Sequence, residues 1–278
     1  MKKSTKLLFL AIMLVAGMAG TVLATPSTQI WIPSTDIQPF MVGHLNIDNY
    51  FRSSGVVKAP PNGAATRDAN IMDIGPTVGI LPFEKIQAEI GFDYLVIAND
   101  PNDNHPFSFN AKIGTPEDSL FPFSPAIAVG IYNAGPTNFE GPNAATGSFG
   151  RAPGITSGQN IVYGLVAKNL PAMGPVPSLG RLSFGGYHGS ERALVDTRGK
   201  SANDGVLASW DRTMTEISDK LWLAVDYMSG NNVDGAISVG ASWAFSKNVS
   251  VIFGYDIWKE KALAGNNTFT TQLDINFP

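Results

Sequence analysis

Segments of about ten residues, in which apolar and polar side chains alternate, are the feature that most constrains the fold of this chain. In residues 86–96 one face carries Ile, Ala, Phe, Tyr and Val, whereas the other carries Gln, Glu, Gly and Asp. The alternation returns in residues 221–227, 237–245, 249–257 and 269–277. Because successive side chains of a strand point to opposite faces, the pattern predicts β-strands with one apolar and one polar face.

The polar faces of these strands favour a membrane barrel over a soluble β-sandwich, which is the alternative. They consist of Gly, Ser, Asn and scattered Asp, whereas the exposed face of a sandwich usually carries many Lys and Glu. Only 15% of the residues are charged, which fits a wall that faces lipid. Aromatic residues favour membrane interfaces, and those near strand ends on the apolar faces are Phe92, Tyr94, Tyr227, Trp243, Phe245, Tyr255, Phe269 and Phe277.

We therefore expect an all-β, transmembrane, antiparallel up-and-down barrel of about twelve strands. The predicted strands lie near residues 41–51, 71–79, 86–97, 107–114, 123–133, 159–168, 180–188, 204–212, 218–229, 235–245, 249–258 and 268–277. Connectors after odd-numbered strands are mostly long and rich in Gly, Pro, Asn and Ser, and the others are mostly short. Short turns at one end and long loops at the other are typical of outer-membrane barrels. Ten or fourteen strands remain open, because two of the segments are short.

The first residues have the pattern of a secretory signal peptide. Three lysines precede an apolar stretch, and small residues follow up to a cleavage-like site at Ala24. A retained membrane anchor is the alternative. We expect a signal peptide over residues 1–24, an N-terminal periplasmic segment over 25–40 and the barrel over 41–278. Without the signal peptide, 16 basic and 23 acidic residues leave a net charge of −7.

Composition excludes several classes of protein. The absence of cysteine excludes disulfide scaffolds, thiol enzymes and Cys-ligated zinc. A net charge of −4 for the whole chain and a pI of 5.3 provide no basic field for nucleic acid. The histidines His44, His105 and His188 are far apart in sequence, so we expect no metal site and no cofactor.

The signal peptide, the alternating strands and the closing strand together resemble Gram-negative outer-membrane β-barrel proteins of the porin-like kind. The resemblance covers the whole mature chain, is architectural and points to no single characterised family. It implies insertion into outer-membrane lipid after cleavage near Ala24. It also implies that the barrel-assembly machinery reads the last strand, whose apolar residues are Leu273, Ile275 and Phe277. Pro278 after the final aromatic residue departs slightly from that pattern.

Strand parity assigns a set of charged residues to the inner wall. Twelve strands give a backbone radius of roughly 12 Å and a passage of about 10 Å, provided that no loop folds inward. The predicted lumen-lining acids are Asp48, Asp73, Glu89, Asp93, Asp211, Asp226, Asp256 and Asp274, and the predicted bases are Lys112, Lys168, Arg181 and Lys220. The excess of acids predicts a narrow channel for ions or small polar solutes with a preference for cations.

Two alternatives to a channel remain open from the sequence. The charges could pair across a blocked lumen in a structural or adhesive barrel, with the loop 134–158 folded inward or exposed for binding. The other alternative is an outer-membrane lipid esterase, because His188 and Ser190 have the spacing that places two side chains on one face of a strand. This pair is similar to the catalytic dyad of outer-membrane phospholipases and lipid A deacylases. A convincing third residue to orient the histidine is missing, since Glu191 and Asn203 are poorly placed.

Overall fold

The structure is a computed structural model that describes residues 27–54, 70–97, 107–136, 158–172 and 178–277. The predicted signal peptide, most of the loop 134–158, His105 and Pro278 lie outside the described residues. No helix in the described part of the chain is long and apolar enough to cross a membrane.

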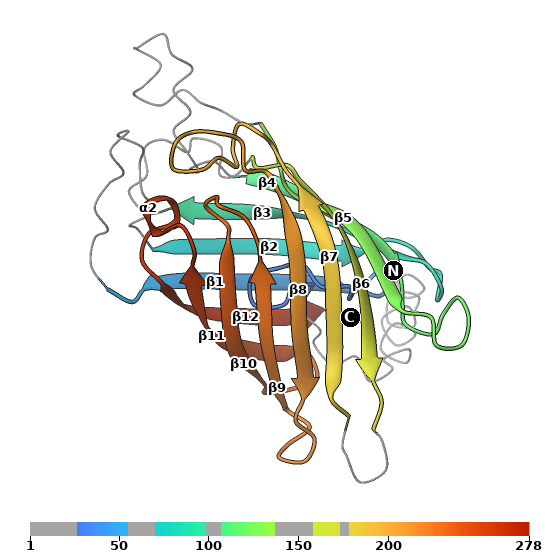
Figure 1. Cartoon of the computed structure of the whole chain (residues 1–278). Helices are drawn as coiled ribbons and strands as arrows, with labels where there is room; N and C mark the ends of the chain where they lie inside the picture. Colours follow the sequence, from blue (N-terminus) through green and yellow to red (C-terminus); the bar gives the residue numbers. More distant parts are fainter. Residues whose placement is uncertain (1–26, 55–69, 98–106, 137–157, 173–177, 278) are drawn as a thin grey trace, which may run out of the picture.

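Twelve strands form the structure, and they coincide closely with the alternating segments of the sequence (Figure 1). Their bounds are β1 Gly43–Arg52, β2 Ile71–Gly79, β3 Gln87–Ile97, β4 Phe107–Thr115, β5 Ala126–Ala134, β6 Ile161–Leu170, β7 Gly180–His188, β8 Asp204–Thr213, β9 Leu221–Met228, β10 Ala236–Ala244, β11 Val249–Trp258 and β12 Thr268–Phe277. A single helical turn, α2 (Lys261–Ala264), precedes β12.

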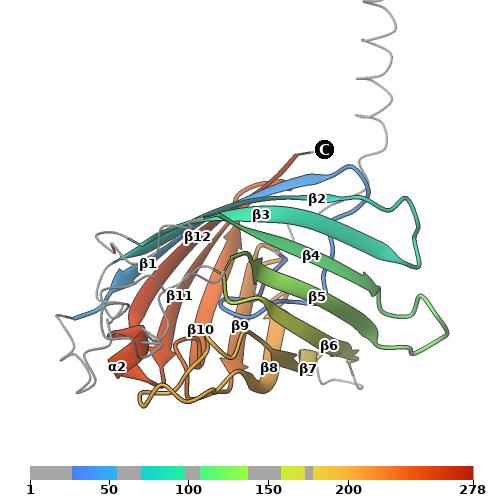
Figure 2. The ribbon, with the colours of Figure 1, turned by 90° about the horizontal axis from the view of Figure 1, so that it is seen from above.

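The strands close into one barrel in which every strand pairs antiparallel with its neighbours in sequence (Figure 2). β1 and β12 complete the ring, from Gly43 opposite Phe277 to Arg52 opposite Thr268. The closed antiparallel barrel of twelve strands is therefore confirmed, as is the architecture implied by the resemblance to outer-membrane barrel proteins. Closure leaves no strand edge unpaired, which is a requirement for a sheet in lipid.

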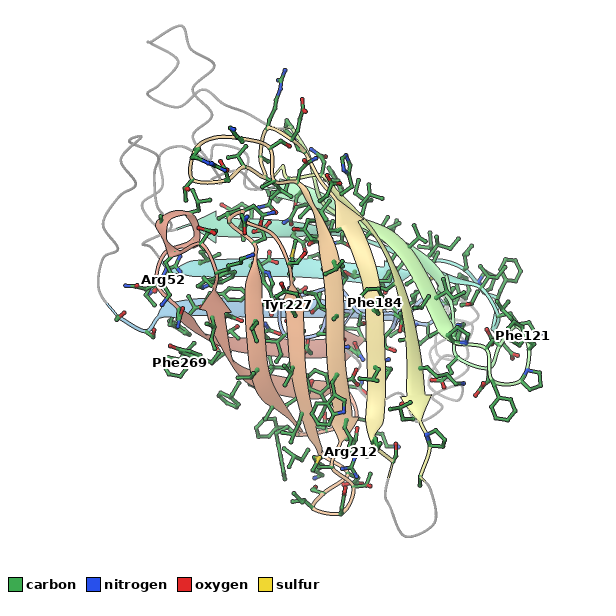
Figure 3. All side chains as sticks on the ribbon, viewed as in Figure 1. Arg52, Phe121, Phe184, Arg212, Tyr227 and Phe269 are labelled. Atoms are coloured by element: carbon green, nitrogen blue, oxygen red, sulfur yellow. The ribbon has the colours of Figure 1, made fainter. Side chains whose placement is uncertain are left out.

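The outer face of the barrel is apolar. Phe184 on β7 and Phe269 on β12 project outward in Figure 3, and each exposes more than half of its surface. Exposed apolar side chains on other strands continue the band around the barrel: Ile90, Phe109, Val129, Val166, Val225, Ile237, Phe253 and Ile257. A continuous apolar surface of this kind is expected on a wall that faces hydrocarbon.

Part of the inner face is also apolar, contrary to the expectation of a polar inner face. Tyr163 and Leu165 on β6, Tyr187 on β7 and Leu207 on β8 are buried inside the barrel, and we call them the apolar wall. They belong to one packed cluster with residues of the long-loop end, including Leu194, Val233 and Leu263. This cluster packs side chains of the described loops against the inner face of β6, β7 and β8. Both faces of β6 are therefore apolar, and alternation alone does not distinguish them.

The segment before β1 differs most from the expectation. We expected residues 25–40 to form a periplasmic segment ahead of the barrel, but residues 27–38 lie inside it, and Phe40 is exposed at the end of β2. Ile30 and Ile32 are fully buried, and Gln29 and Gln38 are almost fully buried. In Figure 2 this blue segment runs within the ring of strands. The physical reason is the hydrophobic effect, because the apolar side chains of the segment are removed from water when they pack against the inner wall.

Candidate functional site: a lumen crossed by the N-terminal segment

The N-terminal segment, residues 27–40, enters from the short-turn end and folds back on itself. A bridge joins Phe40 to Gly79 at the end of β2. A second bridge joins Thr28 to Pro33, and the amide of Gln29 donates to the carbonyl of Ile32 over 2.7 Å. These bonds produce a tight reverse turn with Ile30 and Trp31 at its tip. The amides of Gln29 and Ser34 are satisfied within the turn, and the backbone groups at the tip are left to bind the wall.

Arg181 of β7 is the main charged anchor of the segment. Its guanidinium donates two bonds to the carboxylate of Asp36, over 2.7 and 2.8 Å, and a third over 2.9 Å to Asp211 of β8. Burial by itself would raise the pKa of Asp36, but the charge and hydrogen bonds of Arg181 hold that pKa below its ordinary value. Fork-like pairing of this kind fixes geometry as well as charge. Asp36 is thereby held to the β7–β8 side of the lumen.

Lys112 of β4 and Glu89 of β3 hold the opposite side of the segment. The Lys112 ammonium lies 3.1 Å from the Glu89 carboxylate, and both side chains are buried. It also donates to the backbone carbonyls of Ser27 and Asp36, over 2.8 and 2.6 Å. Glu89 accepts the amide of Gln38 over 2.7 Å. The segment is therefore attached to both sides of the barrel and crosses the lumen.

The tip of the segment binds to a carboxylate. Asp226 of β9 accepts the amides of Ile30 and Trp31 through one oxygen, over 2.8 and 2.9 Å. Gln272 of β12 donates to the carbonyl of Ile30 over 2.6 Å. The Trp31 indole donates to the carbonyl of Asp234, in the loop between β9 and β10, over 2.9 Å. Neighbouring amides that point at one carboxylate oxygen form a small anion-binding turn.

Two glycines make room for the tip. Gly240 of β10 and Gly254 of β11 are direct partners across their strands and face the side chain of Ile30. A Cβ atom on Gly254 would lie 2.9 Å from an Ile30 methyl carbon, and one on Gly240 would lie 3.0 Å from another. The two glycines therefore form a notch that fits one isoleucine, which explains their place on an inner wall.

Two cavities inside the barrel border the segment, and both touch Thr28. One, of about 440 Å³, lies toward β7–β11 and the short-turn end and is lined by Arg181, Asp211 and Lys220. The other, which we call the acidic cavity, has about 160 Å³ and lies between the segment and the first strands. The residues at its acidic side are Asp48 of β1, Asp73 of β2 and Asp93 of β3, which we call the acidic wall.

All eight predicted lumen acids lie on the inner side of the barrel. Three of them, Glu89, Asp211 and Asp226, bind the segment directly. Asp256 accepts from Thr268 over 2.7 Å, and Asp274 lies 3.4 Å from His44. The three residues of the acidic wall form no ion pair with any Lys or Arg that the structure describes.

The predicted basic residues separate into three groups. Lys112 and Arg181 lie inside and hold the segment, whereas Lys220 is exposed at the short-turn mouth. Lys168 does not line the lumen, contrary to the prediction: it shares the outward side of β6 with Val162 and Val166, opposite the exposed Leu182. There it pairs with Glu117 and Asp118 of the β4–β5 turn. The parity was misassigned because the inner face of β6 is apolar. Eight acids against Lys112, Arg181 and Lys220 leave a formal excess of five negative charges.

His188 and Ser190 do not form the expected dyad. β7 ends at His188, so Ser190 lies beyond the strand, where its amide donates to the carbonyl of Gln159. The His188 ring instead lies 2.6 Å from the carboxylate of Asp204, its cross-strand partner, and both side chains are exposed. Because the strand ends too early, the spacing that suggested the esterase does not bring the two groups together.

Sequence reasoning missed the role of the segment and of the residues that bind it. Asp36, Gln272 and Trp31 were not candidate site residues, although Gln272 lies on a polar face of a predicted strand. Gln29 and Gln38 are buried and Trp31 is partly buried, but no periodic pattern in the sequence predicts this, because a tight turn has no repeat. Among the described residues, no group of three or more His, Asp or Glu side chains is placed to hold a metal ion.

Comparisons with known proteins give distant likenesses. No protein-family model matches the chain, and no curated protein matches it. Among solved structures, an outer membrane channel from Pseudomonas putida F1 has 11% identity and a TM-score of 0.44, over 87% of this chain and 96% of that one. OmpF of Salmonella typhi, in complex with daunomycin, has 8% identity and a TM-score of 0.40, over 85% and 97%. An outer membrane protein of Acinetobacter baumannii has 9% identity and a TM-score of 0.40, over 87% and 100%. These likenesses are too distant to assign a function to this chain.

Proposed function

We propose that this protein is an outer-membrane channel for small cations, and that its own N-terminal segment narrows the lumen. The apolar outer band supports insertion into a lipid bilayer. The predicted signal peptide, cleaved near Ala24, and the final strand with Leu273, Ile275 and Phe277 on its outward side support export and assembly into the outer membrane. The barrel-assembly machinery and outer-membrane lipid are accordingly its proposed partners.

The excess of acids on the inner wall is the observation that carries the cation preference. Five of the eight acids do not bind the segment, and the acidic wall lies directly on a cavity. Rings of carboxylates attract cations and repel anions at close range. A small cation entering from the short-turn end would pass the larger cavity first and reach the acidic wall beyond Thr28.

Planar bilayers test this proposal. We expect the purified barrel, reconstituted in a gradient of KCl, to conduct. Its reversal potential should have the sign expected when K⁺ carries more of the current than Cl⁻. The double variant Asp48→Asn/Asp73→Asn should move that potential toward zero, because two lumen carboxylates lose their charge. Lys168→Gln is the matched control, since its charge lies on the outer side and its loss should leave the potential unchanged. A chloride preference in the parent protein would refute the proposal.

A barrel with a closed lumen is the second candidate, and one observation favours it: the segment is bonded to strands on both sides of the lumen. In that case the reconstituted protein does not conduct, and a variant that lacks residues 27–38 does. The two candidates thus give opposite results for the full-length mature protein in the same bilayer.

A further inference from the structure

The lining of the acidic cavity combines carboxylates with aromatic rings. The acidic wall contributes three carboxylates from adjacent strands, with Asp48 directly opposite Asp73 across β1 and β2. Aromatic rings also line the cavity: Trp31 and Trp258, and Tyr50, which is the next inward residue after Asp48 on β1. Lys112, which is paired with Glu89, and His44 line it as well. A space lined by both carboxylates and rings is suited to a ligand that is charged at one end and apolar at the other.

The carboxylates of the cavity are short of partners. Asp48 exposes 8% of its surface, and one of its oxygens accepts no hydrogen bond from any residue that the structure describes. The same is true of one oxygen of Asp73. The second Asp48 oxygen accepts a long hydrogen bond of 3.3 Å from Asn46. Asp93 accepts a hydrogen bond of ordinary length, 2.8 Å, from Asn110. Buried carboxylate oxygens without donors are costly, and a bound cation with N–H groups would remove that cost.

The aromatic side favours an organic cation over a bare ion. The ring of Trp31 stands perpendicular to Tyr50 and to Trp258, with centroid distances of 5.5 and 4.7 Å. Tyr132 and Tyr163 form a further pair, 5.8 Å apart, on the same cavity. Ring faces attract ammonium groups and also bury the alkyl carbons attached to them. A hydrated metal ion would gain nothing from this side.

The size of the cavity limits the ligand. A dry cavity of about 150 Å³ accommodates benzene in a well-studied protein, so the acidic cavity accommodates about six non-hydrogen atoms. That number corresponds to an ammonium group with a short alkyl chain. Larger amines or sugars require the N-terminal segment to move.

We propose that the acidic cavity binds a small organic ammonium ion, with its nitrogen at Asp48 and Asp73 and its alkyl carbons against Trp31, Tyr50 and Trp258. The inference rests on the proposed function, because the ligand reaches the cavity through the lumen, and it names the class of cation that the lumen retains.

Calorimetric titration of the full mature barrel in detergent tests this inference, with n-butylammonium chloride as the probe. We expect saturable binding at one site. The neutral isostere n-butanol and the anion butyrate should not bind at the same concentrations, because neither satisfies the carboxylates. Equal binding of butanol would show that only the apolar side is used and would overturn the inference. Tighter binding of CaCl₂ than of n-butylammonium would assign the carboxylates to a metal instead.

Matched variants locate the site. The double variant Asp48→Asn/Asp73→Asn should bind n-butylammonium at least roughly tenfold more weakly than the parent, because both charged partners are lost. The control variant Asp256→Asn also removes a buried inner-wall carboxylate, but Asp256 does not line the cavity. This variant should therefore bind n-butylammonium with the affinity of the parent. Heat-dependent migration on a denaturing gel verifies that each variant is a folded barrel. Unchanged affinity in the folded double variant would contradict the proposed site.

The bilayer measurement separates this inference from the proposed function. Conductance with cation preference but no n-butylammonium binding refutes the site and leaves the channel intact. Binding of n-butylammonium without any conductance refutes the channel and leaves a barrel with an internal binding site.

Discussion

The apolar wall and the acidic wall occupy equivalent inner positions of the same barrel, yet they have opposite surroundings. Leu165 and Leu207 of the apolar wall are buried against other parts of the chain, including Ile32 and Leu194, whereas Tyr163 borders the acidic cavity. Asp48 and Asp73 of the acidic wall face a cavity. The difference teaches that the chain covers the aliphatic residues of the inner wall and leaves a space beside Asp48 and Asp73, because apolar surface gains from contact and carboxylates lose water when they are covered.

Removal of the N-terminal segment should have the largest effect on this contrast. A mature protein without residues 27–38 loses every contact that crosses the lumen, so its single-channel conductance in planar bilayers should rise several-fold. A matched variant with residues 27–38 replaced by a Gly/Ser linker of equal length separates loss of the bonded segment from loss of chain volume. Equal conductance in the parent and the deletion variant would mean that the segment does not limit passage.

Shortening a side chain of the apolar wall should cost stability. Leu165→Ala creates a cavity in a packed cluster and should lower the free energy of unfolding by about 2–5 kcal/mol. Leu95→Ala is the control from the other side of the barrel, because Leu95 already lines the acidic cavity and its loss only enlarges that space. Denaturant unfolding in detergent compares the two. Equal losses would contradict the division into a filled and an open side.

Filling the glycine notch should disturb the tip of the segment. A methyl group on Gly254 meets Ile30 and Thr270 at less than 3.0 Å, so Gly254→Ala should destabilise the barrel by about 1–3 kcal/mol. Gly164→Ala on β6 is the control, because a Cβ atom there has no neighbour within 4 Å. The double variant Gly254→Ala/Ile30→Ala should recover part of the loss in an unfolding measurement. An equal effect of the two glycine variants would disprove the notch.

Acid should weaken the pairing of Asp36 with Arg181 that anchors the N-terminal segment. This is the smallest of the four predicted effects. The pKa of Asp36 is depressed in the folded protein, so its pairing with Arg181 contributes stability above the unfolded pKa of about 3.9 and loses it as the pH falls through the lower folded value. Conductance of the parent, taken relative to that of the deletion variant at the same pH, should therefore rise as the pH falls below about 3.9 toward the lower folded pKa.

Asp36→Asn is the control for this effect, because it cannot change its charge. Its conductance should vary with pH only as much as that of the deletion variant, in which the lumen carboxylates titrate without the segment. A parent with the same pH profile as Asp36→Asn would show that the Arg181 pair does not hold the segment.

The strands were predictable because lipid and water demand strict alternation over many residues. The predicted segments 180–188, 249–258 and 268–277 coincide with β7, β11 and β12. The inner position of the eight acids follows from the same alternation, since a carboxylate is costly on a lipid-facing side. Lys168 shows the limit of that reasoning, because both faces of β6 are apolar near it and only its cross-strand partner Leu182 reveals the outward side.

The sequence by itself determined the closed barrel, its two ends and the acidic character of its inner wall, because those depend on local periodicity and on the cost of charge in lipid. Only the tertiary structure decided what occupies the lumen. The segment 27–40 has no periodicity, and its contacts join it to residues such as Arg181, Asp226 and Gln272, which are 145 to 242 positions away from their partners in the chain. Contacts at such separations depend on which strands face each other across a closed ring, and no local pattern records that.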